Sequence, residues 1–450
     1  MEKKNIKKLV GVVSLGCDKN RVDTERMLTY LRDGGYGFTS DPSRADIIIV
    51  NTCGFIAKAR QESMDTIFEM AEYKKLGSCE KLVVTGCMPQ IWIKDMRKDL
   101  PEVDIFLGIN QYQDIVQILD DSYETGKRIV EVTRKPIETN VKNRMITTPK
   151  HYAYLKIADG CNNFCTFCTI PHIRGRYRSK NMEDILQEAN ELVNAGATEL
   201  ILVAQDVTRY GSDLTKDGNP MLVDLIRNLS AIKKLKWIRL LYCYPELVTD
   251  ELLEEMMNNP KLCNYIDMPL QHVSDGILKR MNRRIDKQGI IDLINKIRSL
   301  PQKVAIRTTY MIGFPGETDD DFEELYKFIK KYPLDHVGFF AYSPEAGTPS
   351  ATFPNQVPEK TKQKRLIKLV KAQKNVAKKL SRSFVGKTLE VVYEGIDYNK
   401  AKFFGRSEYQ SPEIDTIVYF KSKDRADIGF RYNIKIKSVK GYDLFGEREV

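Results

Sequence analysis

Three cysteines lie close together in the middle of the chain, in the run Cys161-Asn-Asn-Phe-Cys165-Thr-Phe-Cys168. Three thiolates on one loop can bind three irons of a cubane iron–sulfur cluster and leave the fourth iron without a protein ligand. An open coordination position is typical of a reactive metal site. A zinc site is the alternative, but structural zinc sites use four ligands, and the nearest further candidate, His172, stands in an IPHIRG stretch with no second ligand residue beside it. The spacing therefore predicts a reactive iron–sulfur centre.

A second set of cysteines is dispersed along the first part of the chain. Cys17, Cys53 and Cys87 each follow a short apolar run and are separated by 35 and 33 residues. Residues that follow successive parallel strands meet at the same edge of a sheet, so we expect these three thiols to converge. They predict a second three-cysteine cluster with an open iron. The other cysteines, Cys79, Cys243 and Cys263, are expected to be ordinary buried thiols.

The central run, with the aromatic Phe167 before its last cysteine, resembles the radical S-adenosylmethionine superfamily. This resemblance implies a 4Fe-4S cluster bound by Cys161, Cys165 and Cys168. It also implies that the open iron chelates the amino and carboxylate groups of S-adenosylmethionine, and that Phe167 lies close to the adenine. In such proteins the cofactor supplies the radical chemistry, and the protein positions and shields it.

Both cysteine sets together resemble the methylthiotransferases, over essentially the whole chain. The matching stretches are SLGCDKNRVDTE, NTCGFI, VTGCMPQ, LKIADGCNNFCTFCTIPHIRGRYRS, MIGFPGET and GTPSA. The resemblance implies an N-terminal methylthiotransferase domain over residues 1–125, a linker over 126–150, a radical SAM domain over 151–383 that ends in a basic helix, and a TRAM domain over 384–450. The expected fold class is α/β: a doubly wound parallel sheet, a partial (β/α)6 barrel, and a small all-β, OB-like module.

Within this family the chain resembles the RimO-like branch, which modifies an aspartate of small-subunit ribosomal protein twelve. The segments that carry this resemblance are Pro269–His272, Tyr342–Gly347, Gly405–Asp415 and Tyr442–Glu447. Two residues depart from the common pattern and preserve every cysteine: Asp18, where proline is frequent, and Lys180, where arginine is frequent.

The resemblance implies transfer of a methylthio group to the β-carbon of that aspartate, with two 4Fe-4S clusters and no catalytic residues beyond the cluster ligands. S-adenosylmethionine is the radical source and the methyl donor, and an electron donor such as flavodoxin or ferredoxin is expected. Two alternatives stay open. One is a MiaB-like tRNA adenosine methylthiotransferase, and the other is a non-catalytic, metal-bound nucleic-acid-binding protein.

Alternating apolar runs and helical patterns predict the elements that position these residues. Helical stretches such as Met182–Asn194 and Asp319–Lys331 separate the runs, so the strands should be parallel and covered on both faces. The predicted strands are Leu9–Leu15, Ile47–Val50, Leu82–Val84, Val103–Leu107, Tyr154–Ile157, Glu199–Val203, Trp237–Tyr242, Tyr265–Met268, Val304–Ile312 and His336–Ala341.

Several polar and glycine residues stand at or near the ends of predicted strands, where a cofactor would bind. The predicted cofactor contacts are Phe167, Gln205, Gln271, Arg307 and Gly313. Gly313 opens a GFPGE stretch that lacks the lysine and hydroxyl residue of a phosphate-binding loop, so a tight structural turn is an equal alternative.

The chain's composition limits its class. Of its 450 residues 42% are hydrophobic and 29% are charged, and no run of 18 apolar residues occurs, so we expect a globular protein without a membrane span. Because the apolar run Leu9–Leu15 is interpreted as a buried first strand and not as part of a signal segment, we also expect a cytoplasmic protein. The net charge of +10 equals that of residues 360–383, which have ten Lys or Arg and no Asp or Glu. This stretch predicts an amphipathic basic helix, either solvated or in contact with nucleic acid. Its predicted apolar face consists of Leu366, Leu369, Val370, Val376, Ala377 and Leu380. Residues 384–450, with 12 basic and 11 acidic residues, count mildly against RNA as the substrate.

Overall fold

The computed structural model describes residues 6–133, 143–422 and 426–449. The chain divides into two compact units, and each is described by itself. The first unit comprises Met1–Pro149, Tyr154–Asn162 and Cys168–Leu192, and the second comprises Lys150–Ala153, Asn163–Phe167 and Val193–Val450.

The first unit contains a six-stranded parallel sheet of order β2-β1-β3-β4-β5-β6. Its strands are β1 (Leu9–Ser14), β2 (Gly37–Phe38), β3 (Ile47–Thr52), β4 (Lys81–Gly86), β5 (Ile105–Leu107) and β6 (Ile129–Glu131). Its helices are α1 (Asp18–Asp33), α2 (Ala57–Leu76), α3 (Cys87–Asp99) and α4 (Ile115–Thr125), with short 3-10 turns η1 (Pro42–Arg44) and η2 (Gln111–Asp114).

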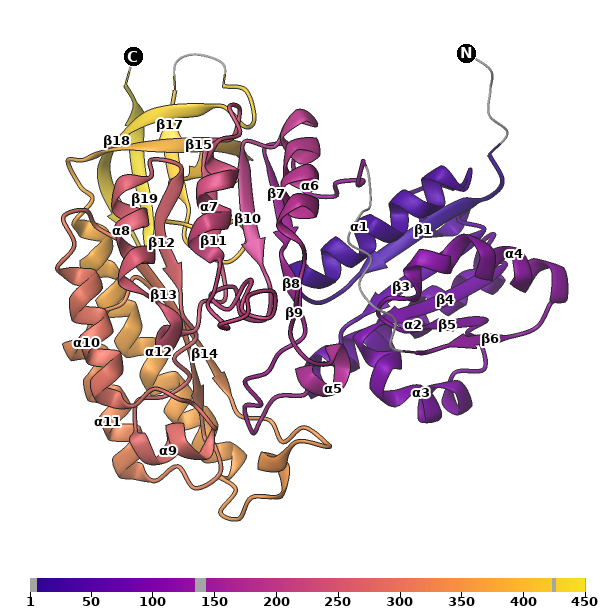
Figure 1. Ribbon diagram of the computed structural model, residues 1–450, viewed down its shortest axis with the longest axis horizontal. Coiled ribbons are helices and arrows are strands. Elements are labelled where there is room, and N and C mark those ends of the chain that lie inside the picture. Colours follow the sequence, from indigo (N-terminus) through magenta and orange to yellow (C-terminus); the bar gives the residue numbers. More distant parts are fainter. Residues whose placement is uncertain (1–5, 134–142, 423–425, 450) are drawn as a thin grey trace. The chain divides into compact units, whose positions relative to one another are not determined.

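Both faces of this sheet are covered by helices (Figure 1). Ile48 and Val50 of β3 face a core that includes Ile67 of α2, whereas Ile47 and Ile49 face a core that includes Met27 of α1. Every residue of β3 is buried, as the uninterrupted apolar run requires of a central parallel strand. The predicted doubly wound sheet is confirmed. β2 and β6 were not predicted, because two or three residues give no periodic signal.

β6 falls inside the range 126–150, which the sequence suggests as a linker, and residues 134–142 of that range lie outside the described part of the chain. The remainder of the first unit begins at Tyr154, inside β7 (Tyr152–Lys156), which is shared between the two units. It further contains β8 (Ala158–Asp159), α5 (Ile170–Arg174), β9 (Arg178–Ser179) and most of α6 (Met182–Asn194). β8 and β9 pair antiparallel, and the clustered cysteines Cys161, Cys165 and Cys168 lie between them in the chain.

The second unit is built on an open six-stranded sheet of order β14-β13-β12-β11-β10-β7. The strands are β10 (Glu199–Val203), β11 (Trp237–Leu240), β12 (Leu262–Asp267), β13 (Ala305–Ile312) and β14 (His336–Ala341), after β7. The helices are α7 (Leu222–Ser230), α8 (Asp250–Asn258), α9 (Asp275–Arg280), α10 (Lys287–Arg298), α11 (Asp319–Lys331) and α12 (Glu359–Arg382), with 3-10 turns η3 (Pro245–Leu247) and η4 (Pro349–Thr352). The predicted partial barrel is confirmed.

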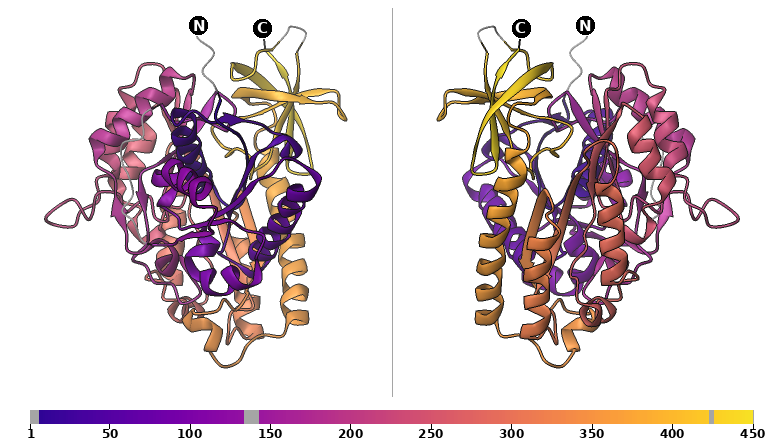
Figure 2. Two further views of the ribbon diagram at one scale, coloured as in Figure 1. Left: turned by 90° about the vertical axis from the view of Figure 1, so that its right-hand side faces the viewer. Right: turned by 90° about the vertical axis from the view of Figure 1, so that its left-hand side faces the viewer.

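The predicted basic helix is α12, which lies along β14 and α11 (Figure 2). Its buried face differs from the predicted apolar face: Val370 is 47% exposed, whereas Lys362 and Arg365 are buried. Lys362 Nζ donates to the carbonyl of Tyr342 at 2.7 Å, and Arg365 pairs with Glu317 at 2.6 Å. Partners on other elements therefore draw two of the ten cations inward.

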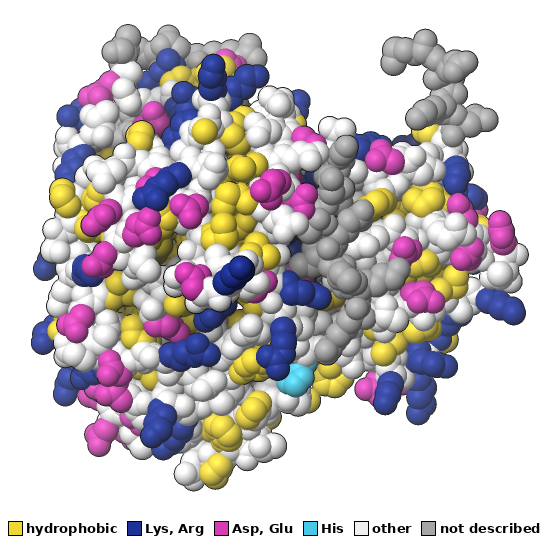
Figure 3. Space-filling view, viewed as in Figure 1, with side chains coloured by type: hydrophobic (Ala, Val, Ile, Leu, Met, Phe, Trp, Pro, Cys, Tyr) yellow, Lys and Arg dark blue, Asp and Glu magenta, His cyan; other side chains and the backbone are white. Residues whose placement is uncertain are grey.

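On the face formed by α7, α8 and α10, basic and acidic side chains are interspersed (Figure 3).

The C-terminal module is a closed barrel of order β15-β16-β17-β19-β18. Its strands are β15 (Thr388–Asp397), β16 (Lys402–Arg406), β17 (Val418–Lys421), β18 (Arg431–Lys440) and β19 (Asp443–Arg448). Alternating side chains fill its core, among them Val391, Phe420, Ile434 and Leu444. The predicted all-β module is confirmed. In the described part of the chain, no helix is both long enough and apolar enough to span a membrane.

Candidate metal centre

The three dispersed cysteines lie at the carboxyl ends of three neighbouring strands of the first unit. Cys17 caps the start of α1 after β1, Cys53 follows β3, and Cys87 is the first residue of α3 after β4. β1, β3 and β4 are adjacent in the sheet, so the expected convergence at one edge is what the fold produces. Cys17 is exposed, Cys53 half-buried and Cys87 buried, and none forms a disulfide.

The loops that carry these cysteines touch one another. A Cβ atom at Gly16, whose φ is +92°, would stand 3.0 Å from the Cβ and 3.3 Å from the Sγ of Cys53. A Cβ atom at Gly54 would stand 3.0 Å from the backbone carbonyl of Cys87. Both positions need glycine because a side chain would push the cysteine loops apart.

Buried amides connect the Cys17 loop to the end of β3, next to Cys53, and the sequence interpretation did not single them out. Asn20 Nδ2 donates to the carbonyls of Leu15 at 2.7 Å and Thr52 at 3.2 Å, which ties the loop after β1 to the last residue of β3. Asn51 Nδ2 donates to the Asn20 carbonyl at 3.1 Å and to Thr24 Oγ1 at 2.7 Å. The only signal in the sequence was their place next to the cysteines, in SLGCDKN and NTC.

Burial and one cation set the electrostatics of these thiols. Burial raises the pKa of Cys87 to about 11, although Arg174 opposes it. Burial also raises the pKa of Cys53. Both groups are therefore protonated at neutral pH in the metal-free protein, and any metal they bind must displace those protons.

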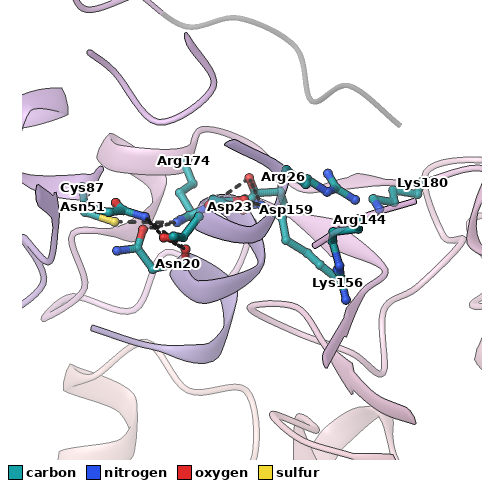
Figure 4. Close-up of polar contacts among 12 residues, drawn as sticks. Asn20, Asp23, Arg26, Asn51, Cys87, Arg144, Lys156, Asp159, Arg174 and Lys180 are labelled. Atoms are coloured by element: carbon teal, nitrogen blue, oxygen red, sulfur yellow. Dashed lines mark hydrogen bonds and ion pairs between the residues drawn. The ribbon is translucent and has the colours of Figure 1, made fainter. Parts of the chain in front are cut away.

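The first unit also contains two of the three clustered cysteines. The N–H of Cys161 donates to the Gly175 carbonyl at 3.1 Å, and the N–H of Ile170 donates to Cys168 Sγ at 3.5 Å. α5, which begins two residues after Cys168, packs Ile173 in one apolar cluster with Cys87. At its end, Arg174 Nη2 lies 3.7 Å from Cys87 Sγ (Figure 4). The segment that follows Cys168 thus packs against Cys87 of the dispersed triad.

Cys165, the middle cysteine of the run, belongs to the second unit, where its surroundings are also polar. Its Sγ lies 3.7 Å from the hydroxyl of Tyr244 and 3.9 Å from Nη1 of Arg283. The Arg283 guanidinium stacks on the Tyr244 ring, with Cζ 4.4 Å from the ring centroid. Asn282 Nδ2 donates to the carbonyls of Asn163 and Phe164 at 3.1 Å each and fixes the start of the loop.

The donor set can be compared with the needs of different metals. Within residues 6–133, 143–422 and 426–449, no three His, Cys, Asp or Glu side chains are grouped as ligands of one metal ion. A single zinc ion needs all its thiolates about 2.3 Å from one point. A cubane cluster is less demanding in this respect, because each thiolate binds a different iron. Three free thiols on touching loops therefore fit an iron–sulfur cluster, and their role as ligands stays a prediction.

The predicted cofactor contacts are dispersed over the second unit. Phe167 packs edge-on against Phe314, with ring centroids 6.4 Å apart, in an apolar cluster with Met281 and Met311. Gln205 lies two residues beyond β10. Gln271, whose φ is +70°, bridges to β13, since its N–H donates to Thr309 and its carbonyl accepts from Met311. Gln205 and Gln271 are near strand ends, as expected, whereas Phe167 lies in the loop between β8 and α5.

Gly313 and Arg307 have other surroundings. Gly313, with φ +74°, directly follows β13, and its N–H donates to Glu317 at 2.6 Å, which describes the tight turn that the sequence left as the alternative. Arg307 is the third of eight residues in β13, so its expected position at the carboxyl end is wrong. It pairs with Asp267 at 2.9 Å and Asp415 at 3.4 Å, and lines a cavity of about 440 Å³ beside α12.

The remaining cysteines behave as expected. Cys79, Cys243 and Cys263 are all buried and free. Burial raises the pKa of each of these thiols. They pack as small apolar side chains.

Comparison with known proteins identifies the family. Residues 155–329 match the radical SAM superfamily, residues 9–108 match the uncharacterized protein family UPF0004, and residues 385–448 match the TRAM domain. The chain is 45% identical over 437 residues to ribosomal protein uS12 methylthiotransferase RimO of Clostridium novyi (strain NT), which covers 97% of each chain. A protein of the same name from Thermoanaerobacter sp. (strain X514) is 46% identical over 441 residues, 98% of this chain and 100% of the relative. This chain belongs to the RimO family. The predicted branch, RimO-like rather than MiaB-like, is confirmed.

Solved structures are similar in fold. The radical S-adenosylmethionine methyltransferase TsrM of Kitasatospora setae, with cobalamin and a [4Fe-4S] cluster bound, aligns with a TM-score of 0.57 at 14% identity, over 76% of this chain and 77% of that one. The cobalamin-dependent S-adenosylmethionine radical enzyme OxsB aligns with a TM-score of 0.51 at 15% identity, over 76% and 54%. At these identities the likeness concerns the fold alone.

Proposed function

We propose that this protein transfers a methylthio group to the β-carbon of an aspartate in ribosomal protein uS12, using S-adenosylmethionine and two 4Fe-4S clusters. Cys161, Cys165 and Cys168 hold one cluster, and Cys17, Cys53 and Cys87 hold the other. The substrate is the one that the RimO relatives carry in their name. An electron donor such as flavodoxin or ferredoxin reduces the cluster held by Cys161, Cys165 and Cys168.

The observation that supports the proposal is the position of three dispersed cysteines after adjacent strands at one sheet edge, with Cys87 in one apolar cluster with the helix that follows Cys168. A radical enzyme without sulfur transfer needs only the clustered cysteines. The dispersed triad packs, at Cys87, against the segment that follows Cys168 of the clustered triad. Two triads in one chain support a reaction in which sulfur delivery and radical generation take place in one protein.

The chain's own residues have defined tasks in this reaction. When bound, S-adenosylmethionine and a reduced cluster supply a carbon radical able to break an unactivated C–H bond, which no side-chain acid or base achieves at neutral pH. Asn20 and Asn51 fix the Cys17 loop to the end of β3, next to Cys53. Ile173 on one side of Cys87, and Phe167 with Phe314 beside the other loop, exclude water, which protects reactive species from side reactions.

The aspartate of uS12 is preferred to a tRNA adenosine as substrate. The RimO relatives that share 45% and 46% of their residues with this chain are named for uS12. The C-terminal barrel adds a physical argument, because 12 basic residues against 11 acidic ones give it almost no net attraction for RNA.

Mass spectrometry of ribosomal protein uS12 tests the proposal. We expect deletion of the gene to remove a methylthio mass shift from one aspartate of uS12, and complementation with the wild-type gene to restore it. Methylthiolated adenosines in total tRNA should be unchanged in the same cells. Loss of the tRNA modification with intact uS12 would contradict the substrate and favour a MiaB-like activity.

A further inference from the structure

Arg174 is a buried cation beside Cys87 of the dispersed triad, and both of its Nη atoms have polar partners. It ends α5 and is 3% exposed. Nη1 donates to Asp23 at 2.9 Å and to both oxygens of Asp159 at 3.2 Å. Nη2 donates to Asn20 at 3.5 Å and to Cys87 Sγ at 3.7 Å (Figure 4). The guanidinium therefore spans two carboxylates on one side and a sulfur on the other.

The charges around Arg174 balance. Lys156 Nζ pairs with Asp23 at 2.7 Å and with Asp159 at 3.2 Å, so two cations and two anions form a buried, neutral quartet. Burial alone lowers the pKa of Arg174, but Asp159 and Asp23 outweigh burial and raise it. In this quartet Arg174 is the member with a bond to sulfur. Because Arg174 and Cys87 are both buried, the charge of Arg174 acts on Cys87 more strongly than it would in water.

We propose that Arg174 is a positioning residue that sets the reduction potential of the cluster held by Cys17, Cys53 and Cys87. It fixes a permanent positive charge and an N–H donor against the Cys87 ligand. A charge of this sign stabilises the cluster after it gains an electron, and hydrogen bonds to the sulfurs raise the potential in the same direction. The inference rests on the proposed function, because it requires that this triad holds a cluster.

Arginine suits this task better than the other cations. Its guanidinium stays protonated throughout the physiological pH range, and its planar fork serves Asp159, Asp23 and Cys87 at once. Lysine would keep the charge but lose the fork geometry. The position is also fixed by the chain, since α5 packs Ile170 and Ile173 beside Cys87.

The test measures potential rather than turnover. The full-length chain with Cys161, Cys165 and Cys168 all changed to alanine leaves the dispersed triad as the one cluster site, which is reconstituted anaerobically and titrated with EPR detection. In Arg174→Gln we expect the ratio of reduced to oxidised cluster at a fixed solution potential to fall about tenfold, a shift of 59 mV to more negative potential. Arg174→Lys should shift it less. Arg144→Gln is the matched control, because its contacts are Glu25, Glu188 and the Tyr154 carbonyl, and it should leave the potential unchanged.

A variant with the opposite sign keeps the proposal falsifiable if Arg174→Gln fails to hold its cluster. Asp23→Asn removes one anion from the quartet and leaves Arg174 in place, so it should shift the potential to a more positive value. Equal potentials in the parent, Arg174→Gln and Asp23→Asn, at equal iron content, would overturn the role of Arg174 and leave the proposed function standing. Absence of iron in the parent itself would overturn the second cluster, and with it both proposals.

Discussion

The two cysteine triads are built in opposite ways. Cys161, Cys165 and Cys168 lie within one loop, whereas Cys17, Cys53 and Cys87 are brought together by three adjacent strands of a parallel sheet. A local run keeps its ligands close whatever surrounds it. A dispersed set depends on the register of the sheet and on the side chains that hold the loops. The dispersed triad should therefore be the more sensitive of the two to changes in its supporting residues.

The largest expected effect separates the two triads by function. Cys17→Ala should lower methylthiolation of uS12 more than about 100-fold, because loss of a ligand exceeds the 10–100-fold cost of losing a residue that supports one. Release of 5′-deoxyadenosine from S-adenosylmethionine should continue, since the clustered cysteines are intact. Both products are measured by liquid chromatography and mass spectrometry. Cys79→Ala, at a buried thiol of the same unit, is the control and should keep both activities. Loss of both in Cys17→Ala would argue against separate roles.

The next effect concerns the counterpart of Arg174 in the second unit. Arg283 places a guanidinium 3.9 Å from Cys165 Sγ, so Arg283→Gln should make that cluster harder to reduce. We expect deoxyadenosine formation to fall roughly tenfold with a weak reductant and to recover with a strong one. Arg283→Lys should fall less. An unchanged rate with the weak reductant would remove the parallel between the two arginines.

Sequence reasoning was strong where the signal is local. It predicted β10 and β14 with their bounds, because short apolar runs flanked by helical patterns leave little ambiguity. It brought Cys17, Cys53 and Cys87 to one edge from a topological rule alone. It missed Arg174 and Arg283, whose sulfur partners are 87 and 118 residues away in the chain and leave no spacing pattern.

The same reason explains the errors. Helical periodicity placed Val370 on the buried face of α12, but ion-pair and hydrogen-bond partners on neighbouring elements bury Lys362 and Arg365 instead. The bounds of β13 were predicted to within one residue, but Arg307 stands inside that strand, where Asp267 and Asp415 pair with it. Contacts between distant elements decide such details.

A second buried charge cluster of the first unit contrasts with the balanced quartet around Arg174. Glu188 pairs with Arg26 at 3.0 Å, with Arg144 at 2.7 Å and with Lys180 at 2.8 Å, and Glu25 pairs with Arg144 at 3.3 Å. Three cations thus share two carboxylates. Burial, followed by repulsion from Arg26, lowers the pKa of Lys180 to about 7. An arginine at this position would stay charged.

This excess cation predicts a pH dependence of stability. Between pH 7 and about 10.5 the unfolded chain binds a proton at Lys180 that the folded chain does not, so the free energy of unfolding should rise with pH. The equilibrium constant for unfolding should fall by at most about tenfold per pH unit. Lys180→Met should remove this slope. Urea unfolding at pH 7, 8 and 9 measures it, with Trp92 of α3 as the fluorescent reporter after Trp237→Phe. Parallel pH profiles for the parent and Lys180→Met would contradict the prediction.

The smallest effect is expected from the exposed cations of α12, which contrast with the buried cations at the triads. Lys371 and Lys378 are exposed. If α12 contacts ribosomal RNA, Lys371→Gln with Lys378→Gln should weaken binding to small ribosomal subunits a few-fold. Each lost phosphate contact should reduce the slope of the logarithm of the binding constant against the logarithm of the salt concentration by about one. Methylthiolation of isolated uS12 should be unchanged. Binding with the same affinity and salt dependence would assign these lysines to a solvated surface.

Counting iron tests the central claim most directly. The anaerobically reconstituted chain should bind about eight irons, four for each triad. The variant with Cys17, Cys53 and Cys87 changed to alanine should bind about four, and so should the variant with the three clustered cysteines changed. If the wild-type chain binds only about four irons, and loss of the dispersed triad does not lower that number, the second cluster does not exist and the account of sulfur delivery is contradicted.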